Sequence, residues 1–312
     1  MEERKLIRLG NSSFAIALPK TWVSKSGLKK GDKVYIVPNS GGEIIVSAEF
    51  KKNINDKEII LNLENKDEEE TARELISAYT SGYKTISVLG DENKIKVAKQ
   101  KAKNFLNLEL IEETEKKAVF KDLLDLEDIK LENFIKRIDN NLKDMFSILL
   151  ELAKTNKSAN EKLKELNEID KDVTKFYFLI WRFMNLGINN PSLQTSLKIN
   201  PSAFIEFFWF SYNMEQIGDE LKRISRKIIK IKGEKESFLQ VLSLISESYD
   251  KCIKAFSEKD KDTAKQIILK KQEIIKLLEK LSENKGFEII AEKLHQINAN
   301  INNNSKMIFY NP

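Results

Sequence analysis

Apolar and polar residues follow different periods in different parts of the chain, and these changes divide it into three parts. Up to about residue 53 the apolar runs are short and separated by turn residues, which predicts small β-strands. Between residues 54 and 130 short apolar runs alternate with longer amphipathic stretches, which predicts strands and helices in turn. From Leu131 almost to the end, apolar residues recur every three or four positions, which predicts helices.

The N-terminal part begins with a predicted hairpin, in which strands ERKLIRL and FAIAL flank the turn GNSS. Gly10 or Asn11 can take a positive φ in that turn, and Pro19 ends the second strand because it lacks a backbone N–H. Thr21 is expected to cap a short helix, TWVSKS, which Gly27 closes.

A second hairpin is predicted after the turn at Gly31 and Asp32, with strands KVYIVP and EIIVSA. Four short strands and one helical turn bury little apolar surface by themselves. The N-terminal part is therefore expected to need a partner subunit for its core.

The middle part has the predicted order β-α-β-α-β-β, a small α/β layer. The strands are KEIILNL, TISVLG, LELIEET and KKAVFKDLL, and the helices are DEEETARELISAYTSGY and ENKIKVAKQKAKNFL. It contains no Gly-rich phosphate loop, metal-ligand cluster or nucleophile motif. We interpret it as a spacer or regulatory platform, with a small-ligand site as the alternative.

The helical part is predicted to hold two sets of three helices. Asn-Asn-Pro-Ser at 189–192 interrupts the first set, and Asn200 and Pro201 cap and begin its third helix. The later helices are expected at about 201–228, 236–258, 261–284 and 286–307. This predicts a mostly antiparallel, duplicated three-helix bundle. The aromatic residues of FYFLIWRF and AFIEFFWFSY are interpreted as its core rather than as a platform for stacking bases.

Charge is distributed unevenly along the chain. Residues 1–53 carry ten Lys and Arg against five Asp and Glu, whereas the remainder carries 43 of each. All of the excess positive charge therefore lies in the N-terminal part. This part is expected to bind a polyanion.

Three features of the sequence indicate the cellular compartment of the protein. The single cysteine, Cys252, cannot form an internal disulfide, which fits a reducing cytoplasm. No apolar run reaches the ~20 residues of a membrane span. The first residues lack the apolar core of a signal peptide. We expect a cytoplasmic protein with no membrane insertion.

The N-terminal motifs G-N-S, P-K and G-L-K-K-G-D resemble those of the SpoVT/AbrB swapped-hairpin domain in type, order and spacing. The resemblance covers roughly residues 3–50, within a domain assigned to 1–53. It implies an intertwined homodimer that binds double-stranded DNA; some related domains only dimerise. The implied DNA contacts are Arg4, Lys5, Arg8, Ser12 and Lys20. The implied turn and structural residues are Gly10, Asn11, Pro19, Gly31 and Asp32.

The helical half has a second resemblance. ELNEIDKDVTKFYFLIWR and WFSYNMEQIGDELKRIS resemble the two inner helices of a PhoU repeat, whose E/D-x-x-x-D motifs hold metal clusters in some members. Glu215 and Asp219 match the motif, and Asp170 matches the facing helix, where Thr174 replaces a second acid. The resemblance implies a divalent or iron ion at Glu215 and Asp219, together with Asp170. From the residues alone, a solvated or salt-bridged carboxylate pair is the favoured interpretation, and the metal site is the alternative.

The second repeat, assigned to 233–312 after a first at 131–232, lacks the acids of the motif. His295 and Ala299 take the two positions on one helix, and Gln272 and Lys276 take those on the other. We expect this repeat to keep its shape without ligands, and the lone His295 to be a partly buried polar residue.

Together the two resemblances imply a regulator of the kind found among archaeal transcriptional regulators of phosphate metabolism. The β part would hold DNA, and the helical half would sense phosphate status directly or through a phosphate transporter ATPase or signalling protein. The alternative is an adaptor that restrains a phosphate transporter and uses the β part only to dimerise. An antitoxin fits the N-terminal part, but it predicts a short toxin-wrapping tail. An enzyme is not expected, because one histidine allows no Cys/His or Ser/His pair.

Overall fold

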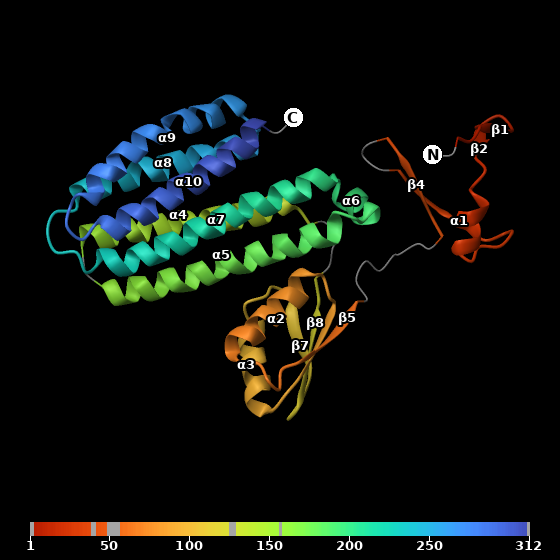
Figure 1. The fold of residues 1–312 in the computed structure, drawn as a ribbon, viewed down its shortest axis with the longest axis horizontal. Coiled ribbons are helices and arrows are strands. Elements are labelled where there is room, and N and C mark those ends of the chain that lie inside the picture. The colour runs from red at the N-terminus through yellow and green to blue at the C-terminus, as the bar shows by residue number, and fades with distance from the viewer. Residues whose placement is uncertain (1–2, 39–41, 49–56, 125–128, 156–157, 311–312) are drawn as a thin grey trace. The chain divides into compact units, whose positions relative to one another are not determined.

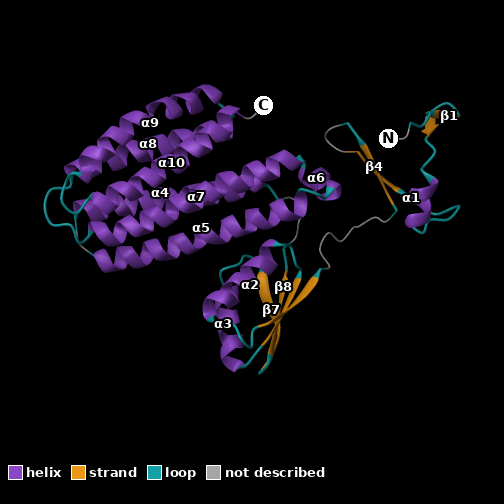
Figure 2. Ribbon diagram, viewed as in Figure 1, coloured by secondary structure: helices purple, strands orange, loops and turns teal. Residues whose placement is uncertain are grey.

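The computed structural model describes residues 3–38, 42–48, 57–124, 129–155 and 158–310. The chain is a multidomain α+β protein, with small β-hairpins at its N-terminus and a large helical C-terminal part (Figures 1 and 2). It divides into two compact units, residues 1–54 and 55–312, which are described separately. The four-part domain boundaries drawn from sequence stay predictions.

The N-terminal unit contains two separate antiparallel hairpins and one short helix. Strand β1 (Ile7–Leu9) pairs with β2 (Ser13–Ala15), and β3 (Tyr35–Pro38) pairs with β4 (Ile44–Ser47). Between the hairpins lies α1 (Lys20–Lys25), which begins one residue before the expected start. Pro19, not Thr21, is its N-cap residue, and no side chain caps the helix; the prediction for Thr21 was wrong.

The N-terminal unit has no core of its own among its described residues. None of the side chains whose exposure is described is buried. Several large apolar side chains are more than half exposed, among them Leu6 (66%), Phe14 (64%), Ile36 (62%) and Ile44 (67%). Because exposing this much apolar surface is costly, the hairpins require a covering surface.

The α/β segment follows the predicted order, with the bounds β5 Glu58–Asn62, α2 Glu68–Thr80, β6 Thr85–Leu89, α3 Glu92–Ala102, β7 Leu108–Thr114 and β8 Lys117–Asp122. The sheet order is β5-β6-β8-β7; β5 and β6 are parallel and the other pairs antiparallel. Asp67 and Glu70 form a capping box at the start of α2. Helices α2 and α3 pack against the sheet (Figure 1).

Six long helices lie where the apolar spacing predicts them. Their bounds are α4 Leu131–Lys154, α5 Ala159–Gly187, α7 Pro201–Ile228, α8 Glu236–Glu258, α9 Lys261–Ser282 and α10 Glu288–Tyr310. Helices α4, α5 and α7 pack on one another, as do α8, α9 and α10, while α10 also packs on α7 (Figure 1). The short α6 (Pro191–Leu197) fills the expected break. The likeness to a PhoU bundle stays a prediction.

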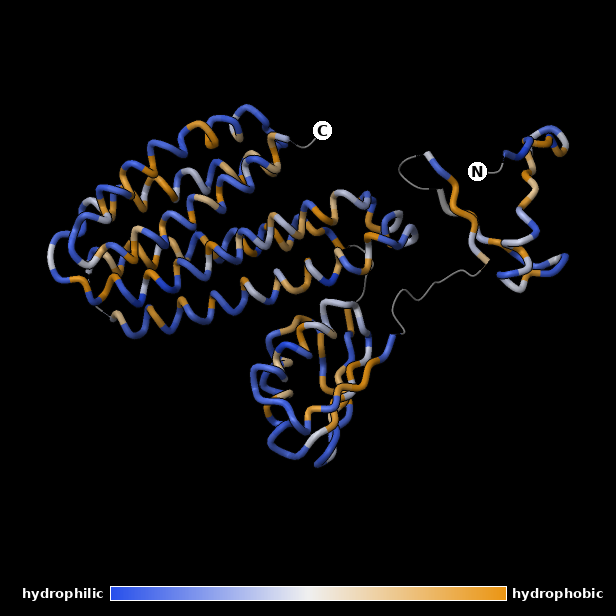
Figure 3. The backbone as a smooth tube through the Cα atoms, in the orientation of Figure 1, coloured by the Kyte–Doolittle hydropathy of each residue, from blue (hydrophilic) through white to orange (hydrophobic). Residues whose placement is uncertain are grey.

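One continuous apolar core runs from the sheet into the helices. Hydrophobic residues recur along each helix and along the strands of the sheet (Figure 3). The assignment of the aromatic runs to this core was partly wrong: Phe183, Phe204 and Phe210 are buried, but Trp209 is 49% exposed. No described helix is long and apolar enough to cross a membrane.

Candidate nucleic-acid interface

The first hairpin carries the cationic residues expected to contact DNA. Gly10 makes its turn with φ +67°, as the sequence requires. Arg8 lies opposite Phe14 in the β1–β2 register, so the two side chains share one face of the hairpin. The Arg8 guanidinium folds back over the turn, where Nε donates to the carbonyl of Gly10 at 3.2 Å and Nη2 to that of Asn11 at 3.4 Å.

All of the expected DNA contacts are exposed to solvent. This set consists of Arg4, Lys5, Arg8, Ser12 and Lys20. The first three lie on or just before β1, Ser12 lies in the turn, and Lys20 is the first residue of α1. The carbonyl groups of the turn position the Arg8 guanidinium. Because these cations are exposed on a short hairpin, they can reach phosphates or base edges without any rearrangement of the unit. Their assignment to DNA stays a prediction.

The second expected turn is built by Asp32. Its carboxylate accepts a hydrogen bond from the backbone N–H of Lys29 at 2.6 Å, and its own N–H donates to the Lys29 carbonyl at 3.0 Å. Gly31 between them has φ +98°. This pair of bonds closes the G-L-K-K-G-D motif into a tight turn and leaves the Lys29 and Lys30 side chains exposed.

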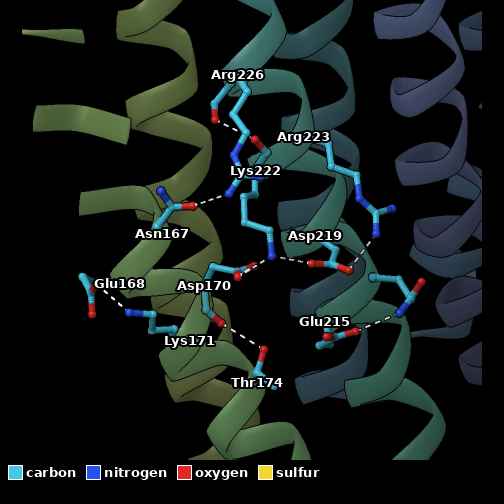
Figure 4. Close-up of polar contacts among 12 residues, drawn as sticks. Asn167, Glu168, Asp170, Lys171, Thr174, Glu215, Asp219, Lys222, Arg223 and Arg226 are labelled. Carbon is cyan, nitrogen blue, oxygen red and sulfur yellow. Dashed lines mark hydrogen bonds and ion pairs between the residues drawn. The ribbon is translucent and has the colours of Figure 1, made fainter. Parts of the chain in front are cut away.

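The expected metal ligands lie between α5 and α7, with a lysine among them (Figure 4). Lys222 Nζ donates to Asp170 Oδ2 and to Asp219 Oδ1, each at 2.6 Å. Asp219 also pairs with Arg223 Nη2 at 3.2 Å. The ammonium group therefore occupies the position that a cation shared by the two carboxylates would take. Thr174, which replaces the second acid, donates its hydroxyl to the Asp170 carbonyl.

With Lys222 in place these residues do not fit a metal ion. Among the residues that the structure describes, no group of three or more His, Cys, Asp or Glu side chains is arranged to hold one. The contacts present are those of the salt-bridged carboxylate pair, and the metal assignment stays a prediction that this geometry disfavours. On α10 the side chain of His295 is exposed rather than partly buried as expected.

Glu215 differs from its neighbours because no described ion pair includes it. Its Oε2 accepts a hydrogen bond from Gln216 Nε2 at 2.8 Å. Burial, and next the charge of Asp219, raise the pKa of the Glu215 carboxyl to about 7, because both disfavour its ionised form. The Glu215 carboxyl group therefore exchanges its proton near neutral pH, unlike an exposed glutamate.

Sequence reasoning missed a buried ion pair that joins the α/β segment to the helices. Arg182 of α5, 1% exposed at its side chain, donates Nη2 to Asp122 Oδ2 of β8 at 2.7 Å. Its guanidinium also bonds to the carbonyls of Tyr79 and Tyr83 and lies 5.0 Å from the centre of the Tyr79 ring. The only sign of this ion pair in the sequence was a single arginine inside the apolar run FYFLIWRF, and the sequence does not show which acidic residue pairs with it.

Comparison with known proteins supports the N-terminal assignment alone. Residues 7–53 match the family described as antidote-toxin recognition MazE, bacterial antitoxin. No curated protein and no solved structure matches the chain. The N-terminal unit thus carries a MazE/AbrB-like DNA-binding domain, and the match extends over no part of the α/β segment or the helices.

Proposed function

We propose that the protein is a homodimeric, DNA-binding transcriptional regulator of phosphate uptake or metabolism. The observation that carries the proposal is the N-terminal unit: it matches a MazE/AbrB-like domain, and its described residues expose their cations and form no core of their own. The net positive charge of the chain lies in this unit. A basic surface on a domain of this type fits the phosphate backbone of DNA.

A second copy of the chain would supply the missing core. The apolar residues of both hairpins, such as Phe14 and Ile36, are exposed on strands too short to bury them within one chain. Interleaving the hairpins of two copies buries both sets at once and brings the cations of both copies together about a two-fold axis. A two-fold-symmetric DNA site matches that arrangement.

The phosphate part of the proposal rests on the resemblance of α5 and α7 to a PhoU repeat. In this proposal the helical half senses phosphate status, directly or through a phosphate transporter ATPase or a signalling protein. Binding there alters the geometry of the two DNA-binding units, which is a coupling between distant sites. The continuous core and the Arg182–Asp122 pair support transmission from the helices to the α/β segment, whose strand β5 follows the N-terminal unit in sequence.

An antitoxin is the second candidate, because the matching family is described by toxin recognition. Antitoxins of this kind wrap a toxin with a short tail, as noted above. Here the domain is followed by a folded unit with a continuous core. This difference favours the regulator.

The test is binding of the full chain to a fluorescent DNA fragment from upstream of its own gene, followed by anisotropy. Arg8→Ala is expected to weaken binding, while Arg73→Ala, which removes an equal charge at a side chain that is 66% exposed on α2, is expected to leave it unchanged. Sedimentation checks that each variant is still a dimer. A wild-type dimer that binds no DNA above background would reject the regulator and favour the transporter adaptor.

A further inference from the structure

A second line of side chains follows the seam between α5 and α7, separate from the core. On α5 it consists of Asp170, Thr174, Tyr177 and Trp181, and on α7 of Ile205, Phe208, Tyr212, Glu215 and Asp219. Each set recurs at intervals of three and four residues, the spacing of one helix face. The core begins beside this seam: a side chain at Gly218 would meet Leu142 of α4 and, at 3.8 Å, the Asp170 carboxylate of α5.

The aromatic members of this seam form one connected surface across the two helices. The ring centre of Tyr177 lies 6.1 Å from those of both Phe208 and Tyr212, and that of Trp181 lies 5.7 Å from Phe208. Trp209 extends the surface, 5.6 Å from Tyr212. Trp209 is 49% exposed and Ile205 is 40% exposed, whereas Tyr177 is only 7% exposed, so the surface reaches solvent along α7 and is buried at Tyr177. A connected aromatic surface of this kind is typical of an interaction site.

The charge at one end of the seam is unbalanced. Asp170 and Asp219 are paired with Lys222, and Asp219 also with Arg223. Glu215, about one turn beyond Tyr212 along α7, has no such partner among the described ion pairs. Burial, and next the charge of Glu215, raise the pKa of the Tyr177 hydroxyl, so the carboxyl group lies within electrostatic reach of the aromatic surface. The seam therefore combines aromatic faces with a carboxyl group for which the described residues provide no ion-pair partner.

We propose that the α5–α7 seam is a docking surface for an amphipathic helix of a partner protein that presents an arginine or lysine to Glu215. Two packed helices with side chains at this spacing accept a third helix through its apolar face. A cation on that helix pairs with the Glu215 carboxylate and lies against the Tyr212 ring. Charge complementarity selects a basic partner helix. This inference does not depend on DNA binding.

The chain provides its own reporter for the test. It has three tryptophans, and Trp181 and Trp209 both belong to this surface. In a Trp22→Phe background the full chain is titrated with two synthetic amphipathic peptides of about five helical turns, or about 18 residues. The peptides have identical apolar faces, but one carries arginines beside that face and the other glutamates. The arginine peptide is expected to bind, shift the emission to shorter wavelength and reduce quenching by acrylamide.

Variants localise the effect. Glu215→Gln is expected to weaken the arginine peptide about tenfold, the effect of losing one hydrogen bond to a charged group. Glu165→Gln, at an exposed position of α5, is the control and is expected to leave the affinity unchanged. Ile205→Asp is expected to abolish binding, and circular dichroism checks that each variant keeps its helices.

Three results would overturn the docking surface itself, and a fourth would overturn the role of Glu215 in it. The first is equal binding of the two peptides, and the second is no binding of either peptide to the folded chain. The third is a blue shift that grows with protein concentration in the absence of peptide, because a second copy of the chain would then cover the seam. Unchanged arginine-peptide affinity in Glu215→Gln would count against the role of that residue and hence against the selected partner.

Discussion

Replacing Arg182 by methionine tests the joint between the α/β segment and the helices. The substitution keeps an unbranched side chain in place of the arginine methylenes but removes the guanidinium. Asp122, with 7% of its side chain exposed, then stays buried without its cation, and the carbonyls of Tyr79 and Tyr83 lose a donor. Breaking a buried ion pair from one side leaves an uncompensated charge, which costs about 3–5 kcal/mol in the free energy of unfolding.

The corresponding change in melting temperature is large for a unit of this size. At about 2–4 °C for each kcal/mol, the loss is about 6–20 °C. Urea denaturation followed by far-ultraviolet circular dichroism gives the free energy directly, and calorimetry gives the melting temperature. Adding Asp122→Leu to Arg182→Met removes the stranded charge, so the double variant is expected to recover part of the stability.

Arg73→Ala is the matched control, because Arg73 pairs with Glu69 at 3.5 Å in an exposed i, i+4 pair. Such a pair contributes at most about 0.5 kcal/mol. If Arg182→Met costs no more than Arg73→Ala, the ion pair does not hold the α/β segment to the helices, and the proposed transmission between them loses its support.

Three further predictions concern the helical half. Burial is the main cause that raises the pKa of Glu215 from 4.5 to about 7. The contribution of this carboxyl group to the free energy of unfolding is therefore complete below pH 4.5 and declines as the pH rises to about 7. Glu215→Gln is expected to remove that decline, measured by urea denaturation across this pH interval. Lys222→Ala is expected to gain thermal stability from added divalent metal, whereas the wild type gains none; a wild-type gain would restore the metal assignment. The Cys252 thiol is buried and its pKa is raised to about 12, so a thiol reagent is expected to react with it only after unfolding, and rapid labelling of the native chain would contradict this.

The sequence predicts the elements well because each has a local cause. The capping box of Asp67 and Glu70, the first-turn Pro201 and the three-four apolar spacing all act within a few residues. The helix at 191–197 was missed because Asn-Asn-Pro-Ser is both a chain break and a good helix start: Asn190 caps α6 and Pro191 begins it.

The site is less predictable because its chemistry depends on contacts across the fold. The i, i+4 spacing places Glu215 and Asp219 on one helix face, but it does not reveal that Lys222 reaches across to Asp170, 52 positions away. The Arg182–Asp122 pair joins residues 60 positions apart. Trp209 lies in an apolar run like its buried neighbours Phe207 and Phe210, and only the packing of α7 decides which of them faces solvent.

The most direct test of the account is the salt dependence of DNA affinity for the intact protein. If Arg4, Lys5, Arg8 and Lys20 of both copies contact phosphates, about eight cations release counterions, and the logarithm of affinity falls with the logarithm of salt at a slope of about −7. Arg8→Ala is expected to reduce that slope by about 2, one contact from each copy, while Arg73→Ala leaves it unchanged. A slope near zero, or one that Arg8→Ala and Arg73→Ala change equally, would contradict DNA recognition by the N-terminal hairpin.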